Sequence, residues 1–199
     1  MLNIMLTGVG GQGTVLAAKV LAQAALSKGW QVRTAETIGM AQRGGSVISH
    51  VRMGSDGEEV YSPLLTKGTA DLIIAFEPGE AARVVPYLAP DGVLVTARTP
   101  IQPVTAALSK DPYSEEAVLE AIEAALAGTD VQLVVVDDEA LVAKVGSRRA
   151  LNTILLASAV ATGRIPVSVE EIKDALSACV KPRFVEMNLS AVDMVVAAK

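Results

Sequence analysis

The sequence predicts an α/β fold of the Rossmann-like class: a mostly parallel sheet with helices on both faces, a β-hairpin insertion and a helical C-terminal tail. The first observation is the order at the N-terminus, where an apolar run at Leu2–Thr7 leads through the turn Gly8–Gly13 into a helical pattern from Thr14 to about Lys28. The second is composition, because 51% of residues are hydrophobic and only 3% aromatic, which suits strands buried between helices. The third is that short apolar strands alternate with helical segments through residues 1–137, whereas residues 138–199 are helical throughout.

These patterns predict one domain over residues 1–199, with an α/β core at 1–137 and a helical tail at 138–199 packed on it. A chain of 199 residues is one ordinary domain and is long enough to bury a core.

Strands are expected where short apolar or alternating runs end in turn residues. They are predicted at Leu2–Thr7, Gln31–Thr37, Ser46–Met53, Glu58–Tyr61, Leu72–Phe76, Val93–Ala97 and Val131–Val136. Ser46–Met53 alternates, and Gly54–Gly57 has the composition of a turn that would return the chain along Glu58–Tyr61. This pair is the predicted antiparallel hairpin, and its exposed edge is a candidate docking surface.

Helices are expected where apolar periodicity coincides with start and stop signals. They are predicted at Thr14–Lys28, Glu80–Leu88, Ser114–Gly128, Glu139–Val145, Ser147–Thr162, from Ser168 onward, and Phe184–Ala198. Ser114 is expected to cap its helix, and Ser168 with Glu171 forms a capping box. Pro90-Asp91-Gly92 reads as a turn, and Arg98–Pro112, with three prolines, as an irregular crossover.

Composition and charge exclude several function classes. The net charge is 17 − 22 = −5 with no basic tract, so we expect no nucleic-acid partner. No apolar run reaches the length of a membrane helix and the N-terminus has no signal-peptide pattern, so we expect no membrane partner and a cytoplasmic protein. The single Cys and single His are too few for a disulfide, an iron–sulfur cluster or a structural zinc within the chain, so no metal site is predicted.

The glycine turn is the first candidate site. Glycines let a phosphate approach the backbone, and the start of the following helix offers free N–H groups to an anion. The hydroxyl of a threonine at this helix start could also donate a hydrogen bond to the phosphate. The candidate cofactor-binding residues here are Gly8, Gly10, Gly11, Gln12, Gly13 and Thr14. The same turn can also be a structural corner without a ligand, and no Gly-Lys-Ser/Thr sequence follows that would make it an ATP-binding P-loop.

Two further sets of residues extend this site. Glu36 stands 23 positions after Gly13, close to where a dinucleotide-binding fold has an acid for the ribose, although it can equally be a solvated carboxylate. The second set, a candidate substrate, coenzyme A or interface loop, comprises Gln42, Arg43, Gly44, Gly45 and Ser46. A guanidinium between glycines can bind a carboxylate or phosphate through paired N–H bonds, but it can also be an exposed loop arginine.

No catalytic residue is expected in this chain. His50 lies on an alternating strand and reads as a surface or edge residue, and Cys179 as a small core residue of an amphipathic helix. Asp137, Asp138 and Glu139 fit a helix start better than a metal site.

The chain resembles the gamma-type subunit or domain of the 2-oxoacid:ferredoxin oxidoreductases (the pyruvate/ketoisovalerate oxidoreductase family). The resemblance is carried by Gly8-Val9-Gly10-Gly11-Gln12-Gly13 and by Gly39-Met40-Ala41-Gln42-Arg43-Gly44-Gly45-Ser46-Val47, and extends over nearly the whole chain. The Gln42-Arg43-Gly44-Gly45 stretch is most similar to the beta subunit of indolepyruvate ferredoxin oxidoreductase.

The resemblance implies a reaction that this chain cannot perform alone. In the family, a 2-oxoacid is decarboxylated on thiamine diphosphate, electrons pass through iron–sulfur clusters to ferredoxin, and the acyl group is transferred to coenzyme A. The sequence has neither a cluster-binding cysteine set nor a Gly-Asp-Gly segment that would hold thiamine diphosphate and Mg²⁺. The implied partners are therefore larger subunits carrying thiamine diphosphate, Mg²⁺ and clusters, with ferredoxin reached through a homo- or hetero-oligomeric complex.

An alternative from another class is a free-standing NAD- or FAD-binding domain. In that case the glycine turn would bind the pyrophosphate and Glu36 the ribose. A dinucleotide-binding domain of this kind would give the Gln42–Gly45 loop no role.

Overall fold

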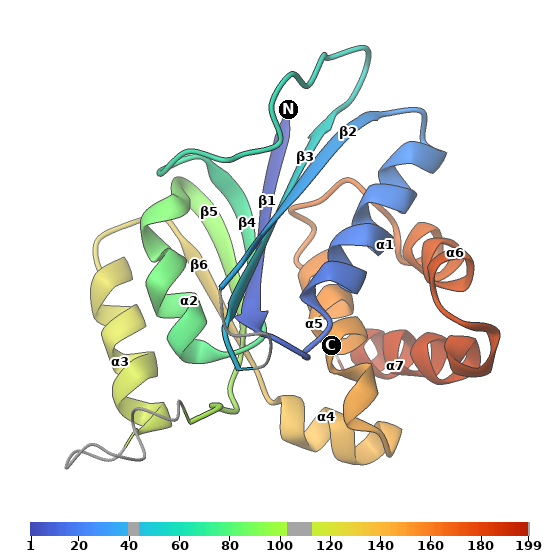
Figure 1. Ribbon diagram of the computed structural model, residues 1–199. Helices are drawn as coiled ribbons and strands as arrows, with labels where there is room; N and C mark the ends of the chain where they lie inside the picture. The colour runs from blue at the N-terminus through green and yellow to red at the C-terminus, as the bar shows by residue number, and fades with distance from the viewer. Residues whose placement is uncertain (40–43, 103–112, 199) are drawn as a thin grey trace.

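A six-stranded mixed sheet forms the centre of the molecule in a computed structural model that describes residues 1–39, 44–102 and 113–198 (Figure 1). The strand order is β2-β3-β1-β4-β5-β6. The strands are β1 (Leu2–Val9), β2 (Gln31–Ile38), β3 (Ser46–Gly54), β4 (Ala70–Ala75), β5 (Leu88–Ala97) and β6 (Gln132–Val136). Because β3 runs antiparallel to both of its neighbours and the other pairs are parallel, the sheet is mostly parallel.

Helices cover both faces of this sheet, which confirms the predicted fold class (Figure 1). On one face lie α2 (Pro78–Val84) and α3 (Glu115–Leu126). On the other face lie α1 (Thr14–Ser27) and α5 (Leu151–Val160), and α4 (Asp138–Val145), α6 (Val169–Cys179) and α7 (Val185–Ala197) pack against these two helices and one another. Among the described residues, the 3₁₀ turns η1 (Val85–Tyr87), η3 (Arg148–Ala150) and η4 (Pro182–Phe184) stand next to α2, α5 and α7.

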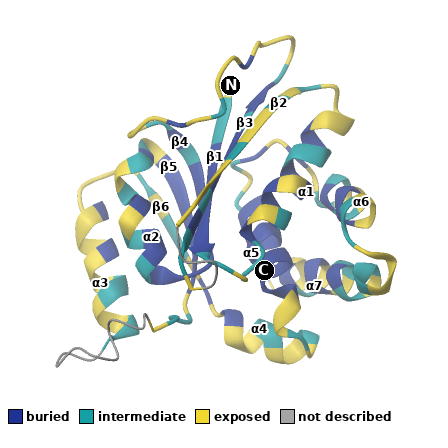
Figure 2. Ribbon diagram, in the orientation of Figure 1, coloured by how far each residue is buried: buried dark blue, intermediate teal, exposed yellow. Residues whose placement is uncertain are grey.

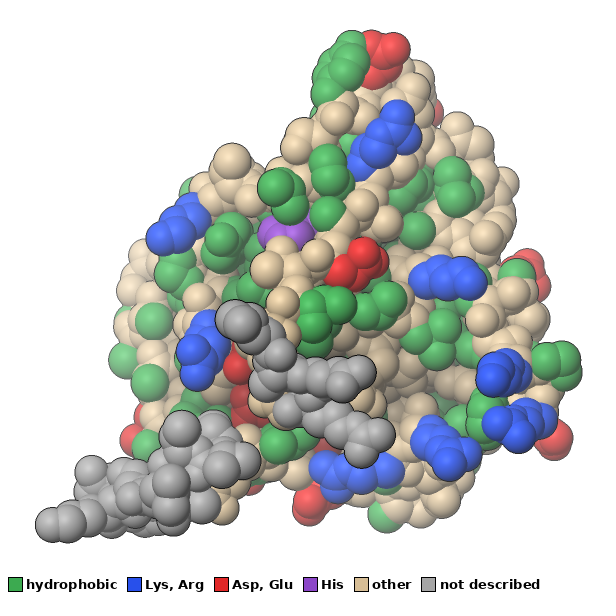
Figure 3. Space-filling model, viewed as in Figure 1, with side chains coloured by type: hydrophobic (Ala, Val, Ile, Leu, Met, Phe, Trp, Pro, Cys, Tyr) green, Lys and Arg blue, Asp and Glu red, His purple; other side chains and the backbone are tan. Residues whose placement is uncertain are grey.

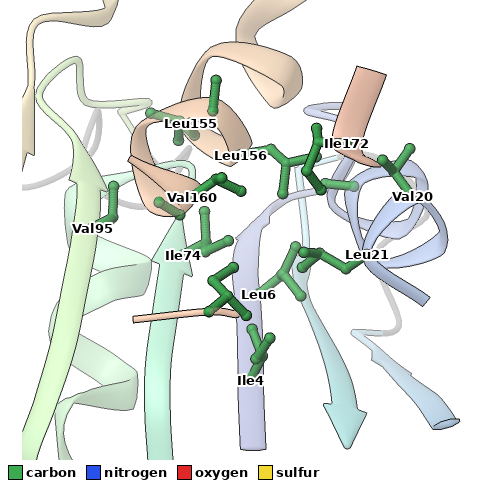
Figure 4. Close-up of a cluster of buried hydrophobic side chains, with 14 of the residues drawn as sticks. Ile4, Leu6, Val20, Leu21, Ile74, Val95, Leu155, Leu156, Val160 and Ile172 are labelled. Carbon is green, nitrogen blue, oxygen red and sulfur yellow. The ribbon is translucent and has the colours of Figure 1, made fainter. Parts of the chain in front are cut away.

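The sheet separates two hydrophobic clusters, because successive side chains of a strand point to opposite faces. Ile4 and Leu6 of β1 face α1 and α5, whereas Met5 between them faces α2 and α3. All ten residues of α5 are buried, and Figure 4 shows Leu155, Leu156 and Val160 of this helix over the sheet. Burial on both faces explains why the central strands read as continuous apolar runs rather than as alternating ones.

The hairpin insertion is present, but it is formed by other strands than predicted. β3 pairs with β2 on one side and with β1 on the other, so both of its edges are occupied. No edge remains for a returning strand, and Glu58–Tyr61, predicted as that strand, is irregular. The exposed edge of the insertion therefore belongs to β2, most of whose residues are exposed in Figure 2.

Several element boundaries also differ from the prediction. The turn expected at Pro90–Gly92 lies inside β5, where the register against β4 shifts. The helix expected at Glu80–Leu88 begins two residues earlier as α2 and ends in a 3₁₀ turn. The Ser114 cap and the Ser168–Glu171 capping box are confirmed, whereas most of the Arg98–Pro112 crossover lies outside the described residues.

Within the described residues, no helix combines the length and the apolar character that a membrane crossing requires.

Candidate functional site

The carboxyl ends of β1 and β4 meet at the topological switch point of the sheet. After β1 the chain builds β2 and β3 on one side, and it then returns to form β4 on the other side. In open α/β sheets, ligand sites form outside the strand ends at such a point. The glycine turn Gly8–Gly13 follows β1 there, and Phe76 and Glu77 follow β4.

The side chain of Gln12 spans this switch point. Its Oε1 accepts a hydrogen bond from the Val9 N–H at 2.7 Å, and its Nε2 donates to the Phe76 carbonyl at 2.7 Å. A Cβ at Gly8 would lie 2.8 Å from Gln12 Oε1 and 2.9 Å from Phe76 Cβ. The first glycine of the turn therefore makes room for the chain's own side chains.

A backbone hydrogen bond joins the glycine turn to the second candidate loop. The Gly10 N–H donates to the Gly45 carbonyl at 2.9 Å. The structure thus brings the two motifs together at one edge of the sheet. Gln42 and Arg43 lie outside the described residues.

The start of α1 opens into a hollow of about 390 Å³ that the glycine turn shares with the start of α5. The helix N-cap is Gly13, with a φ of +89° that favours glycine and no side chain to satisfy the first N–H groups of the helix. Arg148 and Arg149 line the same hollow, and neither forms an ion pair with a described residue. Positive charge and free donors therefore face one space.

Asn152 adds an amide donor to this hollow. Its side chain packs under Gly13 and only 5% of the residue is exposed. Its Oδ1 accepts the Thr153 N–H, whereas its Nδ2 has no hydrogen-bond partner in the described part of the chain and is not among the buried unsatisfied atoms. The Nδ2 is therefore accessible and can donate to water or to a ligand in the hollow.

Carboxylates line a second hollow, of about 290 Å³, between the Gly44–Ser46 segment and α2. Glu80 accepts a hydrogen bond from the Ser46 hydroxyl at 2.5 Å. Glu77 caps α2 through the Glu80 N–H and also accepts the Tyr113 hydroxyl at 2.6 Å. Burial and this hydrogen bond raise the pKa of Tyr113. Arg83 lines the same hollow and pairs with Glu80 at 3.3 Å, so two carboxylates and one guanidinium face it, in contrast to the hollow at Arg148.

Glu36 is not brought to the glycine turn. It lies exposed on β2, and β3 stands between β2 and β1. With strands about 4.8 Å apart, its backbone lies roughly 10 Å to the side of β1. A ribose-binding role for Glu36 requires that β2 lie next to β1, and the antiparallel strand β3 between them separates the two.

The lone His50 is neither a surface nor an edge residue, contrary to expectation. It lies on β3 inside the sheet, with 6% of the residue exposed, and its Nδ1 accepts the Leu65 N–H at 3.3 Å. This contact ties the irregular segment after β3 to the sheet, and burial lowers the pKa of His50.

The other candidates differ in their degree of burial. Cys179 is only partly buried, with its Sγ 4.0 Å from the Lys19 carbonyl, and burial raises the pKa of the thiol. Asp137 caps α4, and Asp138 accepts the N–H groups of Arg98 and Thr99, as expected for acids at a helix start.

The sequence patterns did not indicate three polar residues that line the hollow: Arg148, Arg149 and Asn152. The available signal was Ser147-Arg148-Arg149, which holds the one adjacent pair of arginines in the sequence and directly precedes an apolar helix. These residues follow the glycine turn by more than 130 positions, so their proximity to it in space could not be predicted from the sequence. Among the described residues, no group of three or more His, Cys, Asp or Glu side chains could hold a metal ion.

Comparison with known proteins gives a match over nearly the whole chain. Residues 3–198 match the family model described as pyruvate ferredoxin/flavodoxin oxidoreductase. The chain is 38% identical over 197 residues to the indolepyruvate oxidoreductase subunit IorB of Pyrococcus horikoshii, covering 98% of this chain and 95% of that protein.

Solved structures show the same fold. The gamma subunit of a keto/oxoacid ferredoxin oxidoreductase from Geobacter sulfurreducens superposes with a TM-score of 0.69 at 24% identity, over 99% of both chains. A 2-oxoglutarate:ferredoxin oxidoreductase from Magnetococcus marinus, with 2-oxoglutarate, coenzyme A and succinyl-CoA bound, gives a TM-score of 0.71 at 21% identity. The match covers 98% of this chain and 30% of that longer one.

Proposed function

This chain belongs to the pyruvate ferredoxin/flavodoxin oxidoreductase family, as a subunit of a 2-oxoacid:ferredoxin oxidoreductase, and we propose that it is the accessory gamma-type subunit of an indolepyruvate-like enzyme. The complex converts a 2-oxoacid and coenzyme A into an acyl-CoA and CO₂. Two electrons pass to ferredoxin and the thiol proton is released. The substrate class follows the indolepyruvate oxidoreductase subunits to which the chain is similar over its length.

We assign thiamine diphosphate, Mg²⁺ and the iron–sulfur clusters to partner subunits. The residues of this chain do not fit these groups, because the sequence has one cysteine and the described part holds no metal-binding side-chain cluster. Cluster ligation requires several thiolates. The chain therefore acts within an oligomeric complex, and ferredoxin receives electrons from another subunit.

The part of the reaction that this chain can serve is the binding of coenzyme A. The observation that carries this is the 390 Å³ hollow, which is lined by the uncapped start of α1, by Arg148, which forms no ion pair with a described residue, and by Asn152. These are the groups that bind a phosphate: backbone N–H donors, a helix dipole and a guanidinium. The described end of the second candidate loop, at Gly44–Ser46, is joined to the glycine turn by the Gly10–Gly45 hydrogen bond.

The alternative, a free-standing NAD- or FAD-binding domain, has lost its support. Glu36 is separated from the glycine turn by β3, and Gln12 occupies the switch point. Glu80 is paired with Arg83, but Glu77 has no ion pair among the described residues, and its carboxylate disfavours a pyrophosphate there.

Kinetics of the assembled enzyme test this proposal. Arg148→Ala should raise the KM for coenzyme A about tenfold or more with little change in the KM for the 2-oxoacid, because a charge-assisted hydrogen bond contributes about 1.5–3 kcal/mol. Arg33→Ala is the matched control, since this exposed arginine lies on β2 away from the hollow. An unchanged KM for coenzyme A in Arg148→Ala and in Arg43→Ala would overturn the assignment.

A second measurement tests the accessory role. The purified chain alone should reduce no viologen acceptor with any 2-oxoacid, whereas the co-purified complex should do so. Turnover by the single chain would show that it carries its own redox centre.

A further inference from the structure

A row of hollows leads from the glycine turn to the start of α7. The hollow at Arg148 continues into one of about 320 Å³ with which it shares Leu16, Arg149 and Asn152. A third hollow, of about 330 Å³, adjoins through Met187. Three cations stand along the second and third: Arg149, Lys181 and Arg183, which we call the α7 basic surface.

These cations are exposed and have no counter-ion. Across the described residues, the Lys and Arg side chains that form ion pairs are Lys28, Arg83, Arg98, Arg164 and Lys173. None of the α7 basic surface is among them, although the chain has a net charge of −5. Figure 3 shows Lys and Arg side chains gathered over the region where Figure 1 places the α6–α7 connection and the end of α4.

Two of the three charges share one aromatic ring. The guanidinium carbon of Arg183 lies 4.7 Å from the centre of the Phe184 ring, and that of Arg149 lies 5.5 Å from it. Each contact is favourable on its own. Glu186 lines the third hollow with Arg183 but forms no ion pair with any of the three cations. Two like charges thus lie near each other on one ring, an arrangement that a negatively charged partner stabilises.

The composition around these charges is that of a protein interface. Leu16, Val180, Phe184 and Met187 line the second hollow among the cations. Arg, Met and aromatic residues are enriched where proteins meet, and an apolar centre with a charged rim is the usual arrangement. The surface also extends over two adjoining hollows, which is more than a small anion covers.

We propose that the α7 basic surface docks an acidic segment of the partner subunit, which inserts an apolar side chain into the hollow between Leu16, Phe184 and Met187. The carboxylates of that segment pair with Arg149, Lys181 and Arg183. This rests on the proposed function only in requiring that a partner subunit exists. Phosphate binding at Arg148 is a separate property of the neighbouring hollow.

Affinity measurements between this chain and the thiamine-bearing subunit that co-purifies with it test the proposal. Lys181→Glu combined with Arg183→Glu should weaken the Kd by about a hundredfold at 50 mM NaCl, since close charge pairs across interfaces contribute several kcal/mol. Raising NaCl to 300 mM should weaken the wild-type complex and leave the variant nearly unchanged. Phe184→Ala should weaken binding at both salt concentrations, because it removes the apolar anchor.

Lys67→Glu is the control, because it reverses an exposed charge away from α7 and outside the β2 edge, and it should leave the Kd unchanged. Circular dichroism melting of each variant checks folding. An unchanged Kd in the Lys181/Arg183 variant would overturn the docking proposal while leaving the proposed function intact. A raised KM for coenzyme A at an unchanged Kd would overturn it in favour of a small-anion site. Failure of the wild-type chains to associate would overturn both proposals.

Discussion

Gln12 provides the sharpest test of how the switch point is held together. Gln12→Ala removes the hydrogen bonds from the Val9 N–H to Oε1 and from Nε2 to the Phe76 carbonyl, both 2.7 Å long. Each contributes about 0.5–1.5 kcal/mol net, so the expected loss in the free energy of unfolding is about 1–3 kcal/mol. For a chain of this size each kcal/mol lowers the Tm by about 2–4 °C.

Gln12→Glu separates the two hydrogen bonds. The introduced carboxylate still accepts the Val9 N–H, but its second oxygen faces the Phe76 carbonyl oxygen and is repelled by it. At pH 7, Gln12→Glu should therefore lower the free energy of unfolding more than Gln12→Ala does. The dipole of α1 offsets about 0.3–1 kcal/mol of this loss. A protonated carboxyl can donate to that carbonyl. The pKa of the introduced group is therefore raised by folding, and the deficit should shrink as the pH falls from 7 to 4.

The assay is urea denaturation followed by circular dichroism, with the m-value checked for each variant. Gln23→Ala is the matched control: Gln23 makes one exposed 3.4 Å contact on α1 and its loss should stay within about 0.5 kcal/mol. Gln12 does not hold the switch point together if Gln12→Ala lowers the free energy of unfolding no more than this control does. The same conclusion follows if Gln12→Glu and Gln12→Ala have equal free energies of unfolding at every pH.

Two further predictions concern neighbouring features. Gly8→Ala should cost about 1–3 kcal/mol in urea denaturation, because the added Cβ would lie 2.9 Å from the buried Phe76 Cβ; a neutral result would mean that β1 and β4 can shift apart. Burial lowers the pKa of His50 in the folded chain. As the pH falls through about 6.5, His50 of the unfolded chain therefore takes up a proton, whereas His50 of the folded chain does so only at lower pH. The free energy of unfolding should therefore fall below pH 6.5 as the Leu65–His50 hydrogen bond is lost, and His50→Gln should remove this part of the slope between pH 7 and 5. An identical slope in the variant would assign it to other groups.

The strand–turn–helix start of the fold was predictable because its signals are local. The apolar run of β1, the glycines and the alanine-rich helix follow one another within 28 residues, and each favours its own backbone geometry. The helix caps at Ser114 and Ser168 were predictable for the same reason, since a cap joins residues three positions apart.

The pairing of β3 was not predictable from its own pattern. An alternating strand can pair with the segment before it or after it, and the sequence around Gly54–Gly57 favoured the later one. Pairing with both β1 and β2 depends on long-range contacts. This choice also moved Glu36 away from the site.

The glycine turn, the apolar strand before it and the alanine-rich helix after it are all local features of the sequence, and they suffice to predict a nucleotide-type α/β fold. The contacts of the glycine turn, by contrast, were decided by the tertiary structure. Gln12 closes it toward β4, and the chain returns after β6 to set Arg148 and Asn152 against the start of α1. Side chains so distant in sequence meet only because burying the apolar α5 against the sheet forces them together.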